Sequence, residues 1–408
     1  MQNGHVGIQG PGPSTLSHAR RILLIQYQAR IPPRSTAFVW PSHSILLRIQ
    51  ERLDHDLFRN TKYKATHRYR TLFLRELCAR LEAAVHAESA ILRTQGIDEI
   101  EHPEVDGALL ERYVDSMASG SSSTAVFTSG SAPNTEFTTH CWSHSRDFAA
   151  VGSEDDADLL HGYAKVTIRE EGSAISKGTT GLRTWEAGLR LAAHLIKEPS
   201  VVTAPGTRVL ELGSGAGFVG AVVATQQALS GNVDVRTYLT DMPGQVITRA
   251  RDTLHVNNLD SPPSIAEIRE LDWLELSAER QQSQQRDDLP TINFLAEAKP
   301  TLILAADVVY DPNLIDPLVE TIRACLEAGT RTCRALVAST IRNPETYSAF
   351  EKSLASFGLK THVVELQRPT IYSPQLRREA DIPTLPVFPS AHDQTFDGRV
   401  ELLCITMR

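Results

Sequence analysis

Short runs rich in apolar residues alternate with helical patterns in the second half of the chain. Four of these runs lie at 208–212, 235–239, 265–271 and 302–306. The first is followed by a glycine-rich turn, and each of the other three is followed by a polar residue. Apolar runs of this length are typical of parallel strands that are buried on both faces, and the carboxyl ends of such strands meet at one edge of the sheet. The pattern predicts an α/β, Rossmann-like domain with a ligand crevice at that edge.

Three later runs complete the predicted sheet. Residues 335–339 continue the parallel strands, and residues 361–366 and 400–406 are expected to form an antiparallel hairpin that brings the sheet to seven strands. The segment between the last two runs, 368–396, contains five prolines. We expect this segment to form a long loop on the ligand side of the sheet.

The N-terminal part of the chain has a helical period instead. Apolar residues recur at helical spacing in 46–53 and 72–85, and a third short helix is expected at 109–114. These spacings place an apolar stripe on one face of each helix. They predict a small helical domain at 44–117.

The remaining boundaries follow from composition. Residues 1–43 contain no Asp or Glu and several Arg, Ser and Pro, so we expect a disordered N-terminal tail, with a mitochondrial transit peptide as the alternative. Residues 118–160 begin with a stretch rich in Ser, Thr and Gly and are expected to be a linker. The α/β domain then occupies 161–408.

The overall composition narrows the class of protein. The chain has 408 residues, 41% of them hydrophobic, a net charge of −8 and five cysteines. A negative charge argues against a protein that neutralises nucleic-acid phosphates, and no apolar run is long enough to span a bilayer. The cysteines form no CxxC or Cys/His cluster, which predicts free thiols, a reducing compartment and no metal site. We expect a cytoplasmic monomer with no nucleic-acid or membrane partner.

The most informative stretch is TRVLELGSGAGFVG at 207–220. Gly213, Gly215 and Gly217 follow the first strand, and glycines let the chain turn tightly and approach a ligand without a Cβ in the way. Glu211 precedes them by two positions, which suits the E-x-G-x-G-x-G turn that binds S-adenosylmethionine, a ligand with an ammonium group to neutralise. The run from Gly215 also satisfies the dinucleotide fingerprint GxGxxG, so a nicotinamide or flavin enzyme remains an alternative.

Polar and aromatic residues at the other strand ends add to the predicted crevice. Asp241 follows the second strand, where a carboxylate can accept both ribose hydroxyls. Asp272 offers an acceptor to an adenine amino group, and Trp273 offers an aromatic face to the base. Asp307 ends the fourth strand. Taken singly, each Asp is better explained as a helix cap or a turn former than as a site residue.

Trp185 begins a predicted amphipathic helix at 186–196. One interpretation is a core anchor between that helix and the sheet. The other is an indole face that lies over the cofactor, because a Trp ring attracts a sulfonium or ammonium cation.

Five segments carry a resemblance to a known family: ISKGTTGLRTWEAGLRLAAHLI, VLELGSGAG, LDW, AADVVYDP and IRNPETYSAF. Together they resemble the eukaryotic elongation factor 2 lysine methyltransferases, which belong to the seven-β-strand protein-lysine methyltransferases (methyltransferase family 16). The resemblance covers residues 163–357. The glycine turn is common to all class I methyltransferases, whereas GTTGLRTW and IRNPET are narrower signals.

This resemblance implies a class I S-adenosylmethionine-dependent methyltransferase fold behind a small helical N-terminal domain. It implies S-adenosyl-L-methionine as the cofactor and a lysine of translation elongation factor 2 as the substrate. With the turn and strand-end residues above, the expected cofactor-binding residues are Trp185, Glu211, Gly213, Ser214, Gly215, Gly217, Asp241, Asp272, Trp273 and Ala306.

Asp307 and Tyr310 match the D-x-x-Y signature of the family and are the expected catalytic residues. Asp307 would attract the lysine and orient its amine, and Tyr310 would wall the channel or accept a hydrogen bond. An Asp307 that only caps a turn is the alternative.

Three questions stay open at this level. The loop at 343–346, NPET, is either an ordinary helix start or a substrate-facing element. The target of the reaction is elongation factor 2 or another protein, and a third alternative is a binding protein with a degenerate pocket. The tail, the loop at 118–131 and the insertion at 281–288 depart from the family and leave partner contacts open.

Overall fold

The computed structural model describes residues 13–94, 103–121, 135–144, 158–171, 181–262, 264–282, 290–367, 370–371, 385–392 and 394–408. The chain divides into two compact units. The first comprises Met1–Ser131, Cys141–Tyr163 and Thr370–Ala391, and the second comprises Ala132–His140, Ala164–Pro369 and His392–Arg408.

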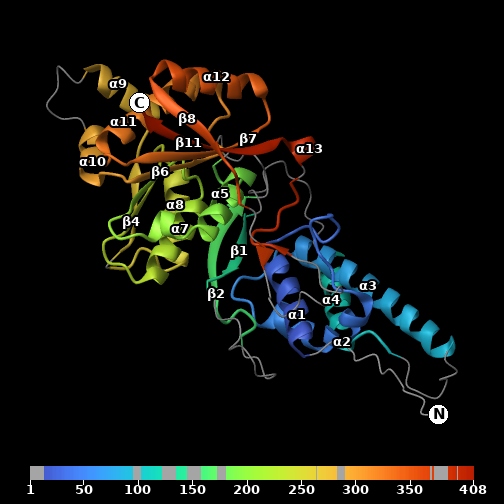
Figure 1. Cartoon of the computed structure of the whole chain (residues 1–408). Helices are drawn as coiled ribbons and strands as arrows, with labels where there is room; N and C mark the ends of the chain where they lie inside the picture. The colour runs from blue at the N-terminus through green and yellow to red at the C-terminus, as the bar shows by residue number, and fades with distance from the viewer. Residues whose placement is uncertain are drawn as a thin grey trace, which may run out of the picture. The chain divides into compact units, whose positions relative to one another are not determined.

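The second unit is built on a seven-stranded sheet with the order β5-β4-β3-β6-β7-β11-β8 (Figure 1). Its strands are β3 (Arg208–Leu212), β4 (Arg236–Asp241), β5 (Ala266–Glu270), β6 (Leu302–Ala306), β7 (Arg334–Ile341), β8 (Leu359–Val364) and β11 (Arg399–Met407). Strands β5, β4, β3, β6 and β7 run parallel, whereas β11 is antiparallel to both β7 and β8. The predicted class I fold, with its antiparallel final strands, is confirmed.

Helices cover both faces of this sheet, which explains why its parallel strands are apolar throughout. One layer contains α5 (Glu186–Lys197), α7 (Phe218–Ser230) and α8 (Gln245–Val256). The opposite layer contains α9 (Trp273–Gln282), α10 (Pro290–Ala298), α11 (Ile315–Ala328) and α12 (Pro344–Ser356). Ile303, Leu318, Ile322 and Phe350 are among the fully buried residues that join the sheet to this second layer. Short helical turns are also present among the described residues of this unit: α6 (Ser200–Thr203), η3 (Pro312–Leu314) and α13 (Gln394–Asp397).

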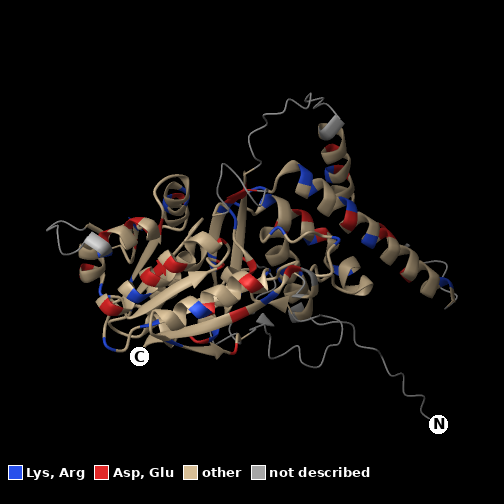
Figure 2. Cartoon of the chain, turned by 90° about the horizontal axis from the view of Figure 1, so that it is seen from above, with Lys and Arg blue, Asp and Glu red and all other residues tan. Residues whose placement is uncertain are grey.

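The first unit contains the predicted helices. They are α2 (His43–Asp54), which continues as the π-helical turn η1 (His55–Arg59), α3 (His67–Thr94) and α4 (Gly107–Ser121). Tyr27, Phe58 and Phe73 pack edge to face in its core, with ring centroids of Tyr27 and Phe73 4.8 Å apart. Acidic and basic residues are interspersed along these helices (Figure 2).

The expectation of a disordered tail over 1–43 is wrong for the described part of that range. Residues Pro13–Gln28 form helix α1, in which Ile22, Leu23 and Ile25 are buried. The helix is held by partners distant in the sequence, because Arg20 forms a two-hydrogen-bond ion pair with the buried Asp56 at 2.7 and 3.0 Å. Most helical stability in proteins comes from such tertiary packing, which local composition does not reveal. Residues 1–12 lie outside the described part.

The expected linker at 118–160 also contains regular structure. Helix α4 extends to Ser121, and β1 (Thr135–Ser143) pairs with β2 (Tyr163–Glu171) in a separate two-stranded sheet. In the expected loop at 368–396, β9 (Thr370–Ile371) pairs with β10 (Leu385–Pro386). The described residues of the insertion at 281–288 end helix α9, and its remainder, like most of 118–131 beyond α4, lies outside the described part.

Three further features bear on the class of protein. Over the described ranges, every helix is too short or too polar to cross a membrane. The same residues contain no cluster of three or more His, Cys, Asp or Glu side chains that is placed to hold a metal ion. All five cysteines are buried free thiols.

Candidate active site

The glycine turn joins β3 to the start of α7 at the carboxyl edge of the sheet. Gly213 and Gly215 have φ angles of +65° and +55°, which only glycine adopts readily. A Cβ on Gly213 would lie 2.8 Å from Val308, and one on Gly215 would lie 2.7 Å from the carbonyl oxygen of Gly181. The turn is therefore closed on both sides to any larger residue. Gly217, at φ +83°, is the N-cap of α7.

Glu211 is buried beneath this turn. Its Oε2 accepts a hydrogen bond from the backbone N–H of Gly220 at 3.0 Å, so it satisfies a donor in the first turn of α7. A Cβ on Gly220 would lie 2.6 Å from the same oxygen, which requires glycine at that position. Burial, and then the nearby Asp241, raise the pKa of Glu211 to about 8, although the Gly220 hydrogen bond opposes this shift. The carboxyl is therefore ready to ionise when a cation binds beside it.

Asp241 ends β4 and faces the turn. Its two carboxylate oxygens accept hydrogen bonds from the backbone N–H groups of Gly215 at 2.7 Å and Met242 at 2.8 Å. Burial raises the pKa of Asp241, and these two hydrogen bonds lower it. Each carboxylate oxygen keeps a further lone pair with which it can accept a hydrogen bond from a hydroxyl group.

Asp272 and Trp273 follow strand β5 and lie at the same edge of the sheet. Asp272 accepts a hydrogen bond from the N–H of Leu274 at 2.9 Å and so stands at the start of α9. The Trp273 ring lies next to the turn, because a Cβ on Gly213 would be 3.4 Å from its Cζ2. Both interpretations of Asp272, as a cap and as a site residue, are thus compatible with its position.

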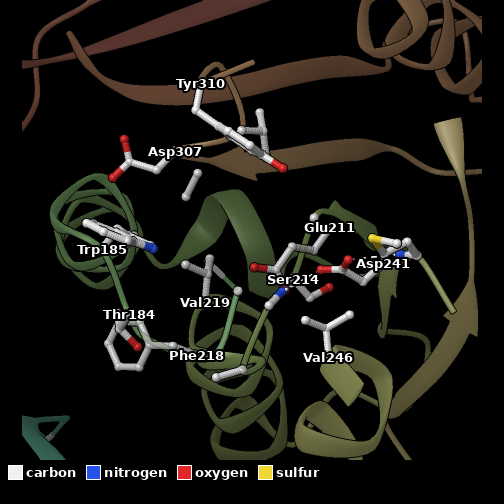
Figure 3. Close-up of a pocket in the computed structure, with 18 of the residues that line it drawn as sticks. Thr184, Trp185, Glu211, Ser214, Phe218, Val219, Asp241, Val246, Asp307 and Tyr310 are labelled. Carbon is white, nitrogen blue, oxygen red and sulfur yellow. Dashed lines mark hydrogen bonds between the residues drawn. The ribbon is translucent and has the colours of Figure 1, made fainter. Parts of the chain in front are cut away.

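These residues line one pocket of about 280 Å³, near the lower end of the range of about 300–1,000 Å³ that is usual for small-molecule sites. In Figure 3, Glu211, Ser214 and Asp241 lie toward one end of this pocket, and Trp185 and Asp307 lie at the other. Of the predicted site residues, the pocket brings together Trp185, Glu211, Gly213, Ser214, Gly215, Asp241, Asp272, Trp273, Ala306, Asp307 and Tyr310. Gly217 is not part of its lining.

Asp307 occupies an unusual position after β6. Its φ is +54°, and its own N–H donates to the carbonyl of Ala338 at 2.9 Å. Its carboxylate accepts hydrogen bonds from the N–H of Ala187 at 3.2 Å and from the N–H and hydroxyl of Thr340 at 2.8 and 3.0 Å. The side chain is 5% exposed. The carboxylate is therefore committed to holding α5 and β7 together rather than open to solvent.

Tyr310 differs from Asp307 in being accessible. The side chain is 54% exposed and extends over the pocket (Figure 3). Partial burial, followed by the carboxylates of Asp241 and Asp311, raises the pKa of its hydroxyl. The phenol is therefore neutral near neutral pH and can both donate and accept a hydrogen bond.

Several lining residues were missed by the sequence interpretation. They are chiefly apolar: Phe218, Val219, Met242, Val246, Leu274 and Val308, together with Thr184. Most adjoin a predicted site residue in sequence, so adjacency was the available signal. Thr184 is fixed by a more distant group, because its N–H donates to Glu170 at 2.5 Å.

The charge of the pocket distinguishes between the two cofactor classes. Four carboxyl groups line it, from Glu211, Asp241, Asp272 and Asp307. The N–H of Gly215, which a pyrophosphate would need, already donates to Asp241. The residues fit a cationic ligand with a ribose and an adenine, as in S-adenosylmethionine, and they oppose the anionic pyrophosphate of a dinucleotide.

The sheet topology and this pocket define a class I S-adenosylmethionine-dependent methyltransferase domain. Residues 164–357 match the family described as "Lysine methyltransferase", methyltransferase family 16. The match includes every predicted site residue from Trp185 to Tyr310.

Individual proteins are also similar to this chain in sequence. The human protein-lysine N-methyltransferase EEF2KMT is 34% identical over 217 residues, which are 50% of this chain and 59% of the relative. The protein-lysine N-methyltransferase EFM3 of Chaetomium thermophilum is 30% identical over 186 residues, 45% of this chain and 50% of the relative. The chain thus spans between half and three fifths of the length of these relatives. A solved structure of a putative methyltransferase from Streptococcus mutans is 13% identical, with a TM-score of 0.34. The similarity covers 59% of this chain and 53% of that one.

Proposed function

We propose that this protein is an S-adenosylmethionine-dependent protein-lysine N-methyltransferase whose substrate is a lysine of translation elongation factor 2. The observation that supports the reaction most strongly is the continuous acidic pocket from Asp241 and Trp273 to Tyr310. Support for the target comes from the GTTGLRTW and IRNPET motifs and from the identity to EEF2KMT and EFM3.

The residues of the pocket have distinct roles in holding the cofactor. Asp241 accepts hydrogen bonds from the ribose hydroxyls. Asp272 accepts a hydrogen bond from the adenine amino group, and the Trp273 ring packs against the base. Glu211, once ionised, balances the ammonium group of the amino-acid portion. Gly213, Ser214 and Gly215 contribute their backbone, as does Ala306. When bound, S-adenosylmethionine supplies an electrophilic methyl group for in-line displacement.

The other end of the pocket must align the lysine amine and exclude water. Tyr310 is an exposed pocket residue with a hydroxyl group, and we assign to this hydroxyl the hydrogen bond that orients the neutral amine. Asp307 acts on the reaction through its hydrogen bonds to Ala187 and Thr340, which fix the start of α5 and the end of β7 at the pocket. In this proposal Asp307 is a positioning residue, and the direct contact with lysine first expected of it is assigned to Tyr310.

A radiolabelled transfer assay tests the proposed activity without assuming the target. The protein is incubated with methyl-labelled S-adenosylmethionine and a lysate of cells that lack this protein. We expect a labelled band of the size of elongation factor 2, with the label recovered as methyl-lysine. Label on another protein would keep the reaction and exclude the target. Tight binding of S-adenosylhomocysteine without any label would instead support a binding protein.

A further inference from the structure

Arg342 has a backbone that is fixed from both sides. The preceding residue, Ile341, ends β7 and pairs with Arg399 of β11. The next residue, Asn343, is the N-cap of α12, and its side chain accepts hydrogen bonds from the N–H groups of Glu345 and Thr346 at 2.9 and 3.4 Å. The backbone on both sides of Arg342 is therefore fixed, by the sheet and by a capped helix, and this fixes the direction of its Cα–Cβ bond.

The Arg342 guanidinium contacts two residues of the pocket without lining it. Its central carbon lies 4.9 Å from the centroid of the Trp185 ring, and its Nη1 lies 3.5 Å from Oδ1 of Asp307. Trp185 does line the pocket, at the end opposite Asp241 (Figure 3). Arg183 also approaches this ring, at a longer 5.8 Å.

Trp185 stands where helix α5 begins. It is the N-cap of α5, but it makes no side-chain cap hydrogen bond, and the cap is supplied by Asp307 through Ala187. Asp307 thus fixes the backbone beside Trp185, while Arg342 holds the ring. Because a planar guanidinium can stack on an indole and pair with a carboxylate at once, an arginine suits this place and a lysine does not.

We propose that Arg342 is a positioning residue for methyl transfer, which acts by holding the indole of Trp185 in the pocket wall. The inference rests on the proposed function, because it concerns the end of the pocket assigned to the lysine. Displacement of a wall by about 1 Å can cost about a hundredfold in rate. Loss of one cation–π contact is expected to free the ring partially and to lower kcat about tenfold.

The first test measures the ring itself and needs no protein substrate. Acrylamide quenching of tryptophan fluorescence is compared between the wild type and Arg342→Ala. The signal of Trp185→Phe, which retains the other three tryptophans, is subtracted so that the quenching of Trp185 itself is obtained. We expect Trp185 to become more accessible in Arg342→Ala and to be intermediate in Arg342→Lys. Arg323→Ala, which removes an exposed arginine paired with Glu327 on α11, is the matched control and should leave quenching unchanged. Unchanged quenching in Arg342→Ala would overturn the proposal.

The second test is a double-mutant cycle on turnover with elongation factor 2. Arg342→Ala should lower kcat about tenfold in the wild-type background but less than about twofold in Trp185→Leu, because its effect passes through the ring. Equal losses in both backgrounds would contradict a role through Trp185. If the wild type transfers no methyl group at all, the proposed function fails, and the quenching result still decides whether Arg342 holds the ring.

Discussion

Asp307, at the end of β6, caps helix α5 by accepting a hydrogen bond from the N–H of Ala187 at 3.2 Å. The two residues are 120 positions apart in the sequence. The N-cap residue of α5, Trp185, has no side-chain acceptor of its own, so a carboxylate from a neighbouring strand replaces it. The D-x-x-Y signature thus places one residue in the framework of the pocket and the other, Tyr310, over its opening.

Asp307→Asn should therefore affect both stability and turnover. An Asn side chain keeps the volume but presents an NH₂ group to at least one of the four donors that now face the carboxylate. We expect the free energy of unfolding to fall by about 1–3 kcal/mol, measured by denaturant titration, and kcat to fall more than the affinity for S-adenosylhomocysteine.

Asp311→Asn is the matched control for that variant. Asp311 also caps a helical turn, through the N–H of Asn313 at 2.9 Å, but it does so in the short η3 at the surface. Its replacement should cost less stability than Asp307→Asn. Equal costs would show that the buried network around Asp307 is not special.

Gly215→Ala is expected to abolish cofactor binding more completely than it unfolds the protein. The new Cβ would be 2.7 Å from the Gly181 oxygen at a φ of +55°, so the turn must open. Calorimetric titration with S-adenosylhomocysteine should show a loss of at least about tenfold in affinity, or about 1.4 kcal/mol. Gly231→Ala, at φ +71° with nothing within 4 Å, should cost about 1–2 kcal/mol of stability and no affinity. Retained affinity in Gly215→Ala would exclude the turn from the site.

The pKa of Glu211 makes a prediction about pH. Because burial raises the pKa from 4.5 to about 8, unfolding releases a proton between those values. The stability of the cofactor-free protein should therefore fall as pH rises through this window, with Glu211 contributing roughly 1 kcal/mol per pH unit. Glu211→Gln, which resembles the protonated form, should flatten the dependence of the melting temperature on pH, whereas the exposed Glu345→Gln should not. Parallel curves for wild type and Glu211→Gln would refute the assignment.

The Arg20–Asp56 pair makes a prediction for the first unit. Both side chains are largely buried, 11% and 4% exposed, so Asp56→Ala leaves a buried guanidinium without its partner. We expect a loss of about 3–5 kcal/mol and early proteolysis within α1. Arg34→Ala, which breaks a 3.3 Å pair whose arginine is 58% exposed, should cost at most about 1 kcal/mol. Resistance of α1 to proteolysis in Asp56→Ala would contradict this account of its anchoring.

The parts of the site that the sequence could predict are local. The glycine turn, Asp241 and Trp273 each lie at or shortly after the end of a strand, and a parallel sheet brings its strand ends to one edge whatever loops join them. Pocket membership of Trp185 and Tyr310 followed from motifs of a few residues. Topology and short motifs were therefore sufficient for these positions.

The remaining features depend on contacts between distant segments. Helix α1 lacks acidic residues and looked like a tail, because its ion pair is with Asp56, 36 positions away. The hydrogen-bond partners of Asp307 were not visible in the sequence for a similar reason, since its donors Ala187 and Thr340 belong to α5 and β7. Strand β1 was hidden in a segment whose composition is typical of a linker. In each case the deciding partner lies beyond any local window.

The most direct measurement is mass-spectrometric mapping of elongation factor 2 after incubation with this protein and S-adenosylmethionine. The account predicts methylation of one lysine, lost when that lysine is replaced by arginine and lost with Gly215→Ala. The controls are an enzyme preparation that binds S-adenosylhomocysteine and elongation factor 2 taken from cells that lack this protein. If the factor stays unmodified under these conditions, the proposed function is wrong.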